Sequence, residues 1–274
     1  MQYEDYSVLM SVYYKEKPEY LKQSIQSMLD QTVSTNDFVI VCDGPLTPEL
    51  DAVLEDYKNQ KPEVFNIVRL EQNVGIGAAV NEGLKHCKNE LIAKMDADDI
   101  AMPERCELQI ARFNSNEKLT VLGGYMDEFD EDFNHPYAMR KVPLTYEAIY
   151  NFAKRRQPFN NITVMLKKSA VIHVGGYSNM NRCEDYDLYV RLLSKGYYCE
   201  NLENVLCRAR VERNALSRRS SLETLKWFVK SRWNVYKIHY SSLVDFLIAC
   251  TAQIIVFVCP NFIQKFLYEK FLRS

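Results

Sequence analysis

The eight cysteines of this 274-residue chain lack the spacing of a metal site or a disulfide framework. No two of them form a Cys-x-x-Cys pair, and they are scattered from Cys42 to Cys259. Closely paired cysteines are typical of structural zinc sites and of small secreted disulfide folds. We therefore expect buried free thiols in a reducing compartment.

The sequence also lacks the usual signals for export or for crossing a membrane. Its first six residues contain no basic region followed by an apolar core, so we expect no signal peptide and a cytoplasmic protein. An uncharged run at residues 246–258 is too short to span a bilayer with confidence. The preceding Trp227 and Trp233 and the basic residues around the run suit a helix lying on an anionic membrane surface. A helix packed on the domain is the alternative.

Low-complexity segments and internal repeats are absent, which leaves an ordinary globular composition with 47% hydrophobic and 26% charged residues. Residues 208–274 carry 12 Lys and Arg against 4 Asp and Glu, which is a net charge of +8. Because the whole chain has a net charge of −2, residues 1–207 have a net charge of −10. We expect a catalytic domain at residues 1–212, with a nucleotide-binding half (1–119) and an acceptor half (120–212). Residues 213–274 would form a helical, membrane-associating region, and no nucleic-acid partner is expected.

Apolar runs alternate with amphipathic segments over the first hundred residues. Strands are indicated at residues 7–12, 38–42, 65–70 and 91–95, and helices begin near Pro18, Pro48 and Gly75. This alternation predicts an α/β fold with a parallel sheet and helices on both faces. From residue 120 the pattern becomes α+β. Strands are then expected at 121–126 and 162–167, an irregular excursion at 127–143, and helices at 146–155, 186–195 and 222–238.

Three carboxylates follow the fourth apolar run: Asp96, Asp98 and Asp99. Ligands bind at the carboxyl ends of the strands in open α/β sheets, and clustered carboxylates there favour a divalent cation that holds a phosphate. Capping of the next helix is the alternative. Tyr13 and Asp43 end two other strands at the same edge, which indicates an elongated ligand lying across the strand ends.

Asp185 directly precedes the helix expected at residues 186–195. It could be a helix N-cap, or a general base that the helix dipole keeps ionised. The basic residues 208–219 indicate either a surface helix face or a loop that closes over a diphosphate.

Two motifs that would indicate other kinds of ligand site match the sequence poorly. A calcium loop starting at Asp96 fails at Ile100 and Ala101, which replace an oxygen ligand and the turn glycine. A dinucleotide-binding fingerprint starting at Gly75 has Val80 where a small residue is needed.

Six stretches, in this order, resemble the inverting, nucleotide-sugar-dependent glycosyltransferases of the GT-A fold, glycosyltransferase family 2, which assemble bacterial capsule, exopolysaccharide and O-antigen. They are SVLMSVYY (7–14), IVCDG (40–44), NVGIGAAVNEG (73–83), MDADD (95–99), VGGY (174–177) and EDYDLYVR (184–191).

The resemblance implies roles for individual residues. Asp185 would be the catalytic base and Glu184 its support. Asp98 would bind Mn²⁺ or Mg²⁺, with Asp96 as a second candidate ligand. The UDP-sugar would be held by Ser11, Val12, Tyr13, Asp43, Asn73, Gly75, Asn81, Asp96 and Ala97. Arg213, Arg218 and Arg219 would contact the diphosphate or a lipid-linked saccharide acceptor.

The chain departs from the family pattern at two places. The first strand ends in Ser11-Val-Tyr-Tyr where many members have Pro-x-Tyr-Asn, and no histidine follows the base motif, where Glu212 or Arg213 falls instead. Two other functions remain open. A sugar-1-phosphate nucleotidyltransferase is expected to have a glycine-rich loop after the first strand, which residues 13–18 lack, and a non-catalytic subunit would bind UDP-sugar without transferring it.

Overall fold

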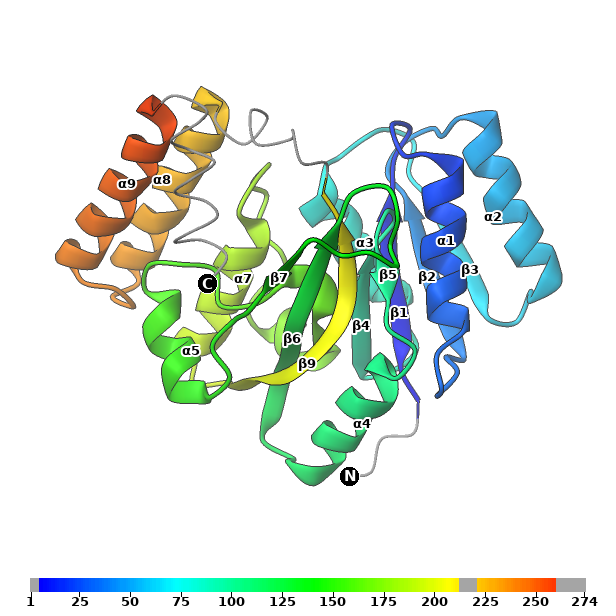
Figure 1. Ribbon diagram of the computed structural model, residues 1–274, viewed down its shortest axis with the longest axis horizontal. Helices are drawn as coiled ribbons and strands as arrows, with labels where there is room; N and C mark the ends of the chain where they lie inside the picture. Colours follow the sequence, from blue (N-terminus) through cyan, green and yellow to red (C-terminus); the bar gives the residue numbers. More distant parts are fainter. Residues whose placement is uncertain (1–4, 212–220, 260–274) are drawn as a thin grey trace.

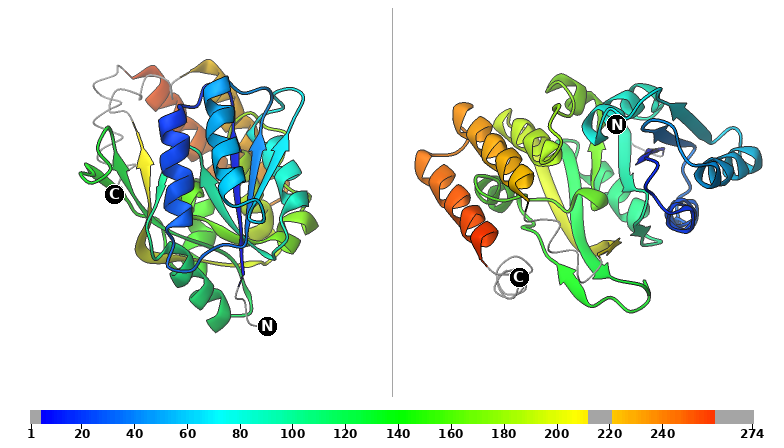
Figure 2. Two further views of the ribbon diagram at one scale, coloured as in Figure 1. Left: turned by 90° about the vertical axis from the view of Figure 1, so that its right-hand side faces the viewer. Right: turned by 90° about the horizontal axis from the view of Figure 1, so that it is seen from above.

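The computed structural model describes residues 5–211 and 221–259 of the chain (Figure 1). Within these residues a nine-stranded mixed sheet runs in the order β3-β2-β1-β4-β8-β6-β9-β5, with β7 paired to β6. Helices cover both faces of the sheet, and the last two helices form a hairpin at one side (Figures 1 and 2).

The first four strands are parallel, as the sequence predicts. They are β1 (Ser7–Val12), β2 (Asp37–Cys42), β3 (Phe65–Arg69) and β4 (Leu91–Asp96). Their connections are α1 (Pro18–Leu29), α2 (Pro48–Gln60) and α3 (Ile76–His86), and prolines at the starts of α1 and α2 supply the fixed φ of a first helical turn. Because β1 lies between β2 and β4, the carboxyl ends of these three strands are adjacent.

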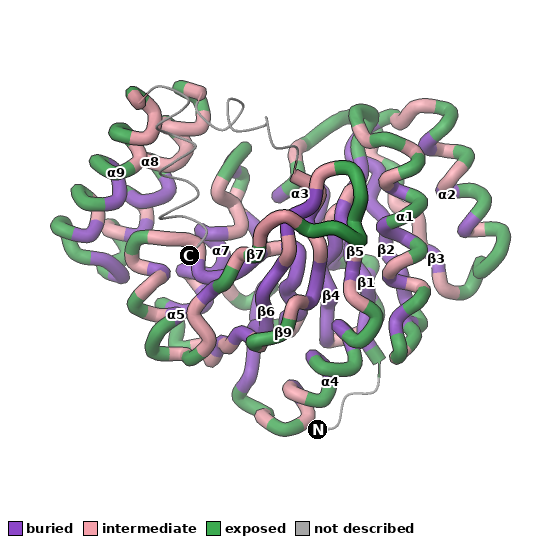
Figure 3. The backbone as a smooth tube through the Cα atoms, in the orientation of Figure 1, coloured by how far each residue is buried: buried purple, intermediate pink, exposed green. Residues whose placement is uncertain are grey.

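Two apolar layers hold the sheet between helices. On one face, α1, α2 and α4 (Arg105–Ser115) bury side chains such as Ile25, Leu54 and Phe113. On the other, α3, α5 (Tyr146–Ala153), α6 (Lys168–His173) and α7 (Glu184–Ser194) bury Leu84 and Leu188 among others. Burying a large apolar side chain stabilises a fold by about 1.5–3 kcal/mol. Buried residues accordingly line the central strands in Figure 3.

The second half of the sheet contains strands that the sequence did not predict. β6 (Leu119–Phe129) is longer than expected, and β7 (Ala138–Arg140) pairs with it inside the supposed irregular excursion. The strand expected at residues 162–167 is present as β8 (Met165–Lys167), which follows the 3₁₀ turn η1 (Asn161–Thr163) and runs antiparallel to both β4 and β6. β9 (Tyr198–Arg210) is parallel to β6 and also pairs with β5 (Ile100–Ala101).

The start of the basic run at residues 208–219 is therefore the end of a strand, which corrects its assignment to a surface helix or loop. Cys207 and Ala209 are buried, whereas Arg208 and Arg210 are half-buried on the opposite face. This alternation is the pattern of a strand with two unlike faces.

The C-terminal hairpin consists of α8 (Leu222–Lys237) and α9 (Leu243–Val258). It packs on the domain through Arg232, whose guanidinium lies 3.5 Å from the Tyr186 ring centroid, and through an Arg155–Asp245 ion pair of 2.6 Å. The opposite face of α9 is apolar and exposed, at Leu243, Val244, Leu247, Ile248, Ile254, Ile255 and Val258. No helix in the described part of the chain has the length and apolar character needed to cross a bilayer.

Candidate active site

Asp43, at the end of β2, organises the loop before α3. Its carboxylate oxygens accept the backbone N–H groups of Val74 at 2.7 Å and Gly75 at 3.1 Å. Asn73 Nδ2 donates to the Asp43 carbonyl at 3.2 Å. Hydrogen bonds to an ionised carboxylate are stronger than neutral ones. A residue predicted to bind the donor thus also fixes the loop that carries two other predicted donor residues.

The β1 corner lies beside Asp43. Ser11 is in register with Asp96 of β4, and the Val12 carbonyl accepts the Asp43 N–H at 2.8 Å. Tyr13 is 42% exposed and contacts the ring of Tyr14 edge-on, at 5.8 Å between centroids. The parallel sheet therefore brings the predicted residues of three strand ends together.

Asn81, on α3, binds the turn that precedes α7. Its Oδ1 accepts the Tyr177 N–H at 2.7 Å and its Nδ2 donates to the Tyr177 carbonyl at 2.8 Å. Gly176 has φ +72°, and a Cβ there would lie 2.5 Å from Asn81 Oδ1. A Cβ on Gly77 would lie 2.8 Å from the Ser178 carbonyl. The NVGIGAAVNEG and VGGY stretches thus form one junction that positions α7.

Lys94 and Asp96 lie on the same face of β4, because residues two apart in a strand point the same way. Lys94 Nζ donates to Asp96 Oδ1 at 2.6 Å, and the Lys94 side chain is only 4% exposed. Burial lowers the pKa of Lys94, but the neighbouring carboxylates, first of all Asp96, outweigh burial and raise it. Glu184 and Asp185 are among these carboxylates. Lys94 is therefore a buried cation between the end of β4 and the start of α7.

Asp98 and Asp99 differ in their contacts. Asp99 is buried, and its Oδ1 accepts the backbone N–H of Arg210 at 2.8 Å, which ties the loop to β9. Burial, Asp96 and Glu16 together raise the pKa of Asp98 to about 7. Arg210 Nε donates to the Asp98 carbonyl at 3.1 Å. Asp99 thus holds the loop against β9, whereas the Asp98 carboxylate lies near the carboxylates of Asp96 and Glu16.

Glu184 and Asp185 are the first two residues of α7, so the sequence-based helix start at residue 186 was two residues late. The N-cap is Cys183, in a left-handed conformation with φ 65°, and Asp185 is therefore not the cap. Asp185 Oδ1 accepts the Tyr186 N–H at 2.7 Å, and Asp185 Oδ2 accepts a hydrogen bond from Gln157 Nε2 at 2.7 Å.

Burial raises the pKa of Asp185, and the hydrogen bonds from Tyr186 and Gln157 lower it by less. Burial, with Asp185 as neighbour, raises the pKa of Glu184 to about 7. The expectation that the helix dipole keeps Asp185 ionised was too simple, because desolvation of a buried carboxylate outweighs the stabilising contacts. Both carboxyl groups therefore hold a proton more tightly than an ordinary solvent-exposed carboxyl group does.

The residues at the end of β4 suit a hard divalent cation that also binds a phosphate. No group of three or more His, Cys, Asp or Glu side chains within residues 5–211 and 221–259 is arranged to hold a metal on its own. Mg²⁺ is commonly held by one or two carboxylates together with substrate phosphates and water. Asp96 and Asp98 offer two carboxylates close enough for one to raise the pKa of the other, which is the kind of donor set that a cation stabilises.

Three residues near the predicted site were missed in the sequence. Lys94 had a signal, because a charged residue inside a buried apolar strand is uncommon. Glu16 and Gln157 had none, since tertiary contacts bring them in, whereas Arg210 belongs to the basic run singled out at residues 208–219. Ala97 is buried beside Asp96. Arg213, Arg218 and Arg219 lie outside the described residues.

Comparison with known proteins identifies the family. The sequence model of glycosyl transferase family 2 matches residues 7–179. The amylovoran biosynthesis glycosyltransferase AmsE of Erwinia amylovora is 35% identical over 97% of this chain and 98% of its own. The UDP-Gal:alpha-D-GlcNAc-diphosphoundecaprenol beta-1,3-galactosyltransferase of Escherichia coli is 32% identical over 98% of this chain and 96% of its own.

Among solved structures, residues 1–349 of Staphylococcus aureus TarS in complex with UDP-GlcNAc superpose with a TM-score of 0.69 at 16% identity, covering 95% of this chain and 77% of that one. This likeness confirms the predicted GT-A fold. The family match over residues 7–179, with the two relatives above 30% identity, shows that the chain belongs to glycosyltransferase family 2 and is a glycosyltransferase.

Proposed function

We propose that this glycosyltransferase moves a sugar from a UDP-sugar to a hydroxyl of a polyprenyl-linked oligosaccharide, with inversion, in the assembly of a surface polysaccharide. One observation carries the proposal. The buried Lys94 lies against Asp96 at the strand ends and interacts with the Glu184–Asp185 pair at the start of α7. The carboxylate proposed to lie beside the donor and the proposed base are therefore linked through one buried cation.

The donor would lie across the carboxyl ends of β2, β1 and β4. Asp43 and the Ser11–Tyr13 corner would hold the uracil, and the loop of Asn73 and Gly75 would form the wall near the ribose, with Asn81 fixing the adjacent turn. Asp96 and Ala97 would lie beside the ribose and diphosphate. Two relatives support a uridine nucleotide: the E. coli enzyme is named for UDP-Gal, and the TarS structure contains UDP-GlcNAc.

Mn²⁺ or Mg²⁺ would be held by Asp98, with Asp96 as second ligand and the donor diphosphate completing the site. When bound, the cation would stabilise the negative charge that builds up on the departing UDP. Arg210, tied to this loop through the Asp98 carbonyl, keeps β9 against the two carboxylates.

Asp185 would accept the proton of the acceptor hydroxyl as that oxygen attacks the sugar. Asp185 is on α7, whereas Asp96 ends β4 and Asp98 follows it, so the proposed base and the proposed diphosphate-binding carboxylates come from different elements, as suits attack opposite the departing UDP. Gln157 orients the Asp185 carboxylate. Glu184, the neighbouring carboxyl group on α7, would support Asp185 in this role.

The acceptor would be a saccharide linked through diphosphate to a lipid, as the name of the E. coli relative states for that enzyme. The exposed apolar face of α9 supports a peripheral location on the cytoplasmic face of the cell membrane, because such a face suits an interfacial helix.

The test is UDP release from a panel of UDP-sugars with Mn²⁺ and a prenyl-diphosphate-linked sugar acceptor. Wild-type protein should release UDP with one or few donors, and Asp185→Asn should lose about 10²–10⁴-fold in rate while UDP affinity is unchanged. A wild-type chain that binds UDP-sugar without releasing UDP would be a non-catalytic subunit. An active Asp185→Asn variant would refute the assignment of the base.

A further inference from the structure

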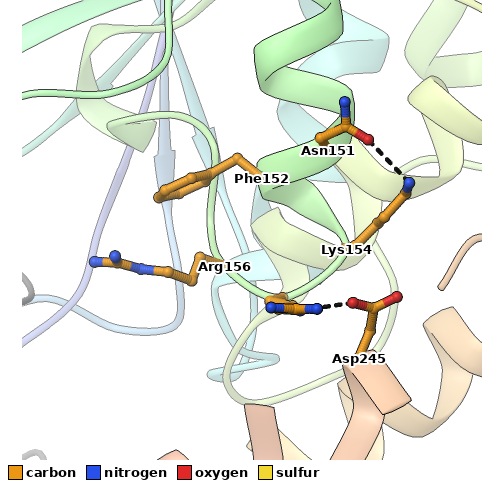
Figure 4. A pocket seen from close by; sticks show the side chains of 6 residues that line it. Asn151, Phe152, Lys154, Arg156 and Asp245 are labelled. Carbon is orange, nitrogen blue, oxygen red and sulfur yellow. Dashed lines mark hydrogen bonds and ion pairs between the residues drawn. The ribbon is translucent and has the colours of Figure 1, made fainter. Parts of the chain in front are cut away.

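A basic pocket of about 450 Å³ lies between the end of α5 and the start of α9 (Figure 4). Its lining consists of Asn151, Phe152, Lys154, Arg155, Arg156 and Asp245. Three of these are cations and one is a carboxylate, which already forms an ion pair with Arg155 at 2.6 Å. Lys154 Nζ donates to the neutral Asn151 side chain at 2.9 Å. The lining thus retains uncompensated positive charge.

Arg156 is the main source of this excess charge. Its guanidinium lies 4.9 Å from the Phe152 ring centroid and extends away from Asp245 (Figure 4). Across residues 5–211 and 221–259, no carboxylate lies within ion-pair distance of Arg156 or of Arg140. Burial and the nearby Arg140 both lower the pKa of Arg156. Two guanidinium groups that repel one another without a counter-ion form a ready anion site.

The pocket lies between the candidate base and the exposed face of α9. The residue after Arg156 is Gln157, which donates to Asp185 at 2.7 Å. Asp245, on the other side, is in the first turn of α9, whose outward residues Leu247 and Ile248 are exposed. A ligand with an anionic group in the pocket would thus lie next to the segment that holds Gln157 and against the first turn of α9.

We propose that Arg156 and Lys154, which line the pocket, bind a phosphate group carried by a lipid, and specifically the diphosphate that joins the acceptor saccharide to its lipid, with Arg140 adding positive charge nearby. The inference rests on the proposed function and adds a residue-level acceptor site to it. Guanidinium groups recognise phosphate oxygens through paired N–H donors, and the lipid chain would extend along the apolar face of α9. A phospholipid headgroup carries the same chemistry, so the experiment separates the two sources.

The full chain is titrated with farnesyl diphosphate, with farnesol and with phosphatidylglycerol vesicles, in the presence of saturating UDP and Mn²⁺ so that the donor site is filled. Arg156→Gln should weaken farnesyl diphosphate binding by about tenfold, the cost of one charge-assisted contact, and Arg140→Gln should weaken it by less, because Arg140 does not line the pocket. Arg156→Lys keeps the positive charge but loses the paired N–H donors of the guanidinium group, so it should weaken farnesyl diphosphate binding by about threefold. Farnesol binding should not change, and Lys61→Gln, an exposed cation at the end of α2, is the matched control.

Each outcome is decisive. Reduced vesicle binding with unchanged farnesyl diphosphate binding would assign the pocket to bilayer headgroups and overturn the acceptor assignment. Unchanged binding of both probes in Arg156→Gln and Arg140→Gln would overturn the site altogether. Melting curves verify that each variant is folded. If Arg156→Gln does not fold, the comparison of Arg156→Lys with the wild type provides the test. Because this titration needs no sugar transfer, a chain inactive with every UDP-sugar would refute the proposed function and leave the pocket result standing.

Discussion

Lys94 Nζ lies 2.6 Å from Asp96 Oδ1, and this contact places a buried cation between the two acidic groups of the active site. Lys94 and Asp96 share a face of β4, whereas Glu184 and Asp185 start α7. Without Lys94, the carboxylates on this face would repel one another in a region of low dielectric. The lysine therefore determines how much negative charge the site can hold.

Replacing Lys94 with Met should destabilise the protein. Removing one partner of a buried ion pair costs about 3–5 kcal/mol, and the lower end applies because Asp96 is partly exposed to water. We expect Lys94→Met to lower the free energy of unfolding in urea by about 3 kcal/mol, and Lys94→Arg by less. A Lys94→Met protein as stable as wild type would show that the contact does not stabilise the fold.

The rate of transfer should fall on the acid side at a pH above the ordinary carboxyl range, because burial raises the pKa of the proposed base Asp185. Burial, with Asp185 as neighbour, also raises the pKa of Glu184, to about 7. A raised carboxyl pKa means that the group takes up its proton at a higher pH, and a protonated base cannot accept another. Glu184→Gln removes one negative neighbour, so the acid limb of its pH–rate profile should move to lower pH. A wild-type limb near the ordinary carboxyl pKa of about 4 would contradict this prediction.

Gln157→Leu should reduce kcat by about tenfold and leave the KM for the donor unchanged, because the lost hydrogen bond orients the base and touches no donor group. Gln157→Glu should be less active at neutral pH than Gln157→Leu, since a second carboxylate beside Asp185 raises its pKa further. A rise in donor KM, with kcat unaffected, would assign Gln157 to donor binding instead.

The parallel core of the fold was readable because strands buried on both faces form short, continuous apolar runs. Residues 91–95 are such a run, and Pro18 and Pro48 mark helix starts directly. β9 was missed because Glu203 and Asn204 are exposed in its middle and its register with β6 shifts between Gly124 and Tyr125. The apolar residues of β9 therefore do not alternate regularly with polar residues along the sequence, and regular alternation is what identifies a half-buried strand.

The candidate site was readable only where a motif carries it. Asp43, Asp98 and Asp185 each follow an apolar run or start a helix, so their positions indicate the sheet edge. The positions of the residues that contact these carboxylates give no such indication. Gln157 lies 28 residues before Asp185, and Arg210 lies 111 residues after Asp99, so only the folded chain places these contacts.

Asp98→Asn should abolish the effect of Mn²⁺ on UDP affinity. A carboxamide oxygen is a much weaker ligand for a hard cation than a carboxylate, and Asp96 alone would hold the ion poorly. UDP titrations with and without Mn²⁺ measure the effect. Asp99→Asn is the control, because Asp99 contacts the Arg210 backbone and should keep the metal response. An unchanged Mn²⁺ response in Asp98→Asn would exclude Asp98 as a ligand.

Charges on the outer face of α9 should release the protein from membranes. Leu247 and Ile254 are 53% and 45% exposed on this face, and each would bury its side chain in a lipid interface. Losing that burial at both positions and adding two carboxylates should weaken binding to phosphatidylglycerol vesicles by about 100-fold. Vesicle co-sedimentation of Leu247→Glu/Ile254→Glu measures this, with UDP affinity as a check on folding.

Ile172→Glu, at a residue 58% exposed on α6, is the matched control and should bind vesicles like wild type. Equal co-sedimentation of the double variant and the wild type would mean that α9 does not contact the membrane.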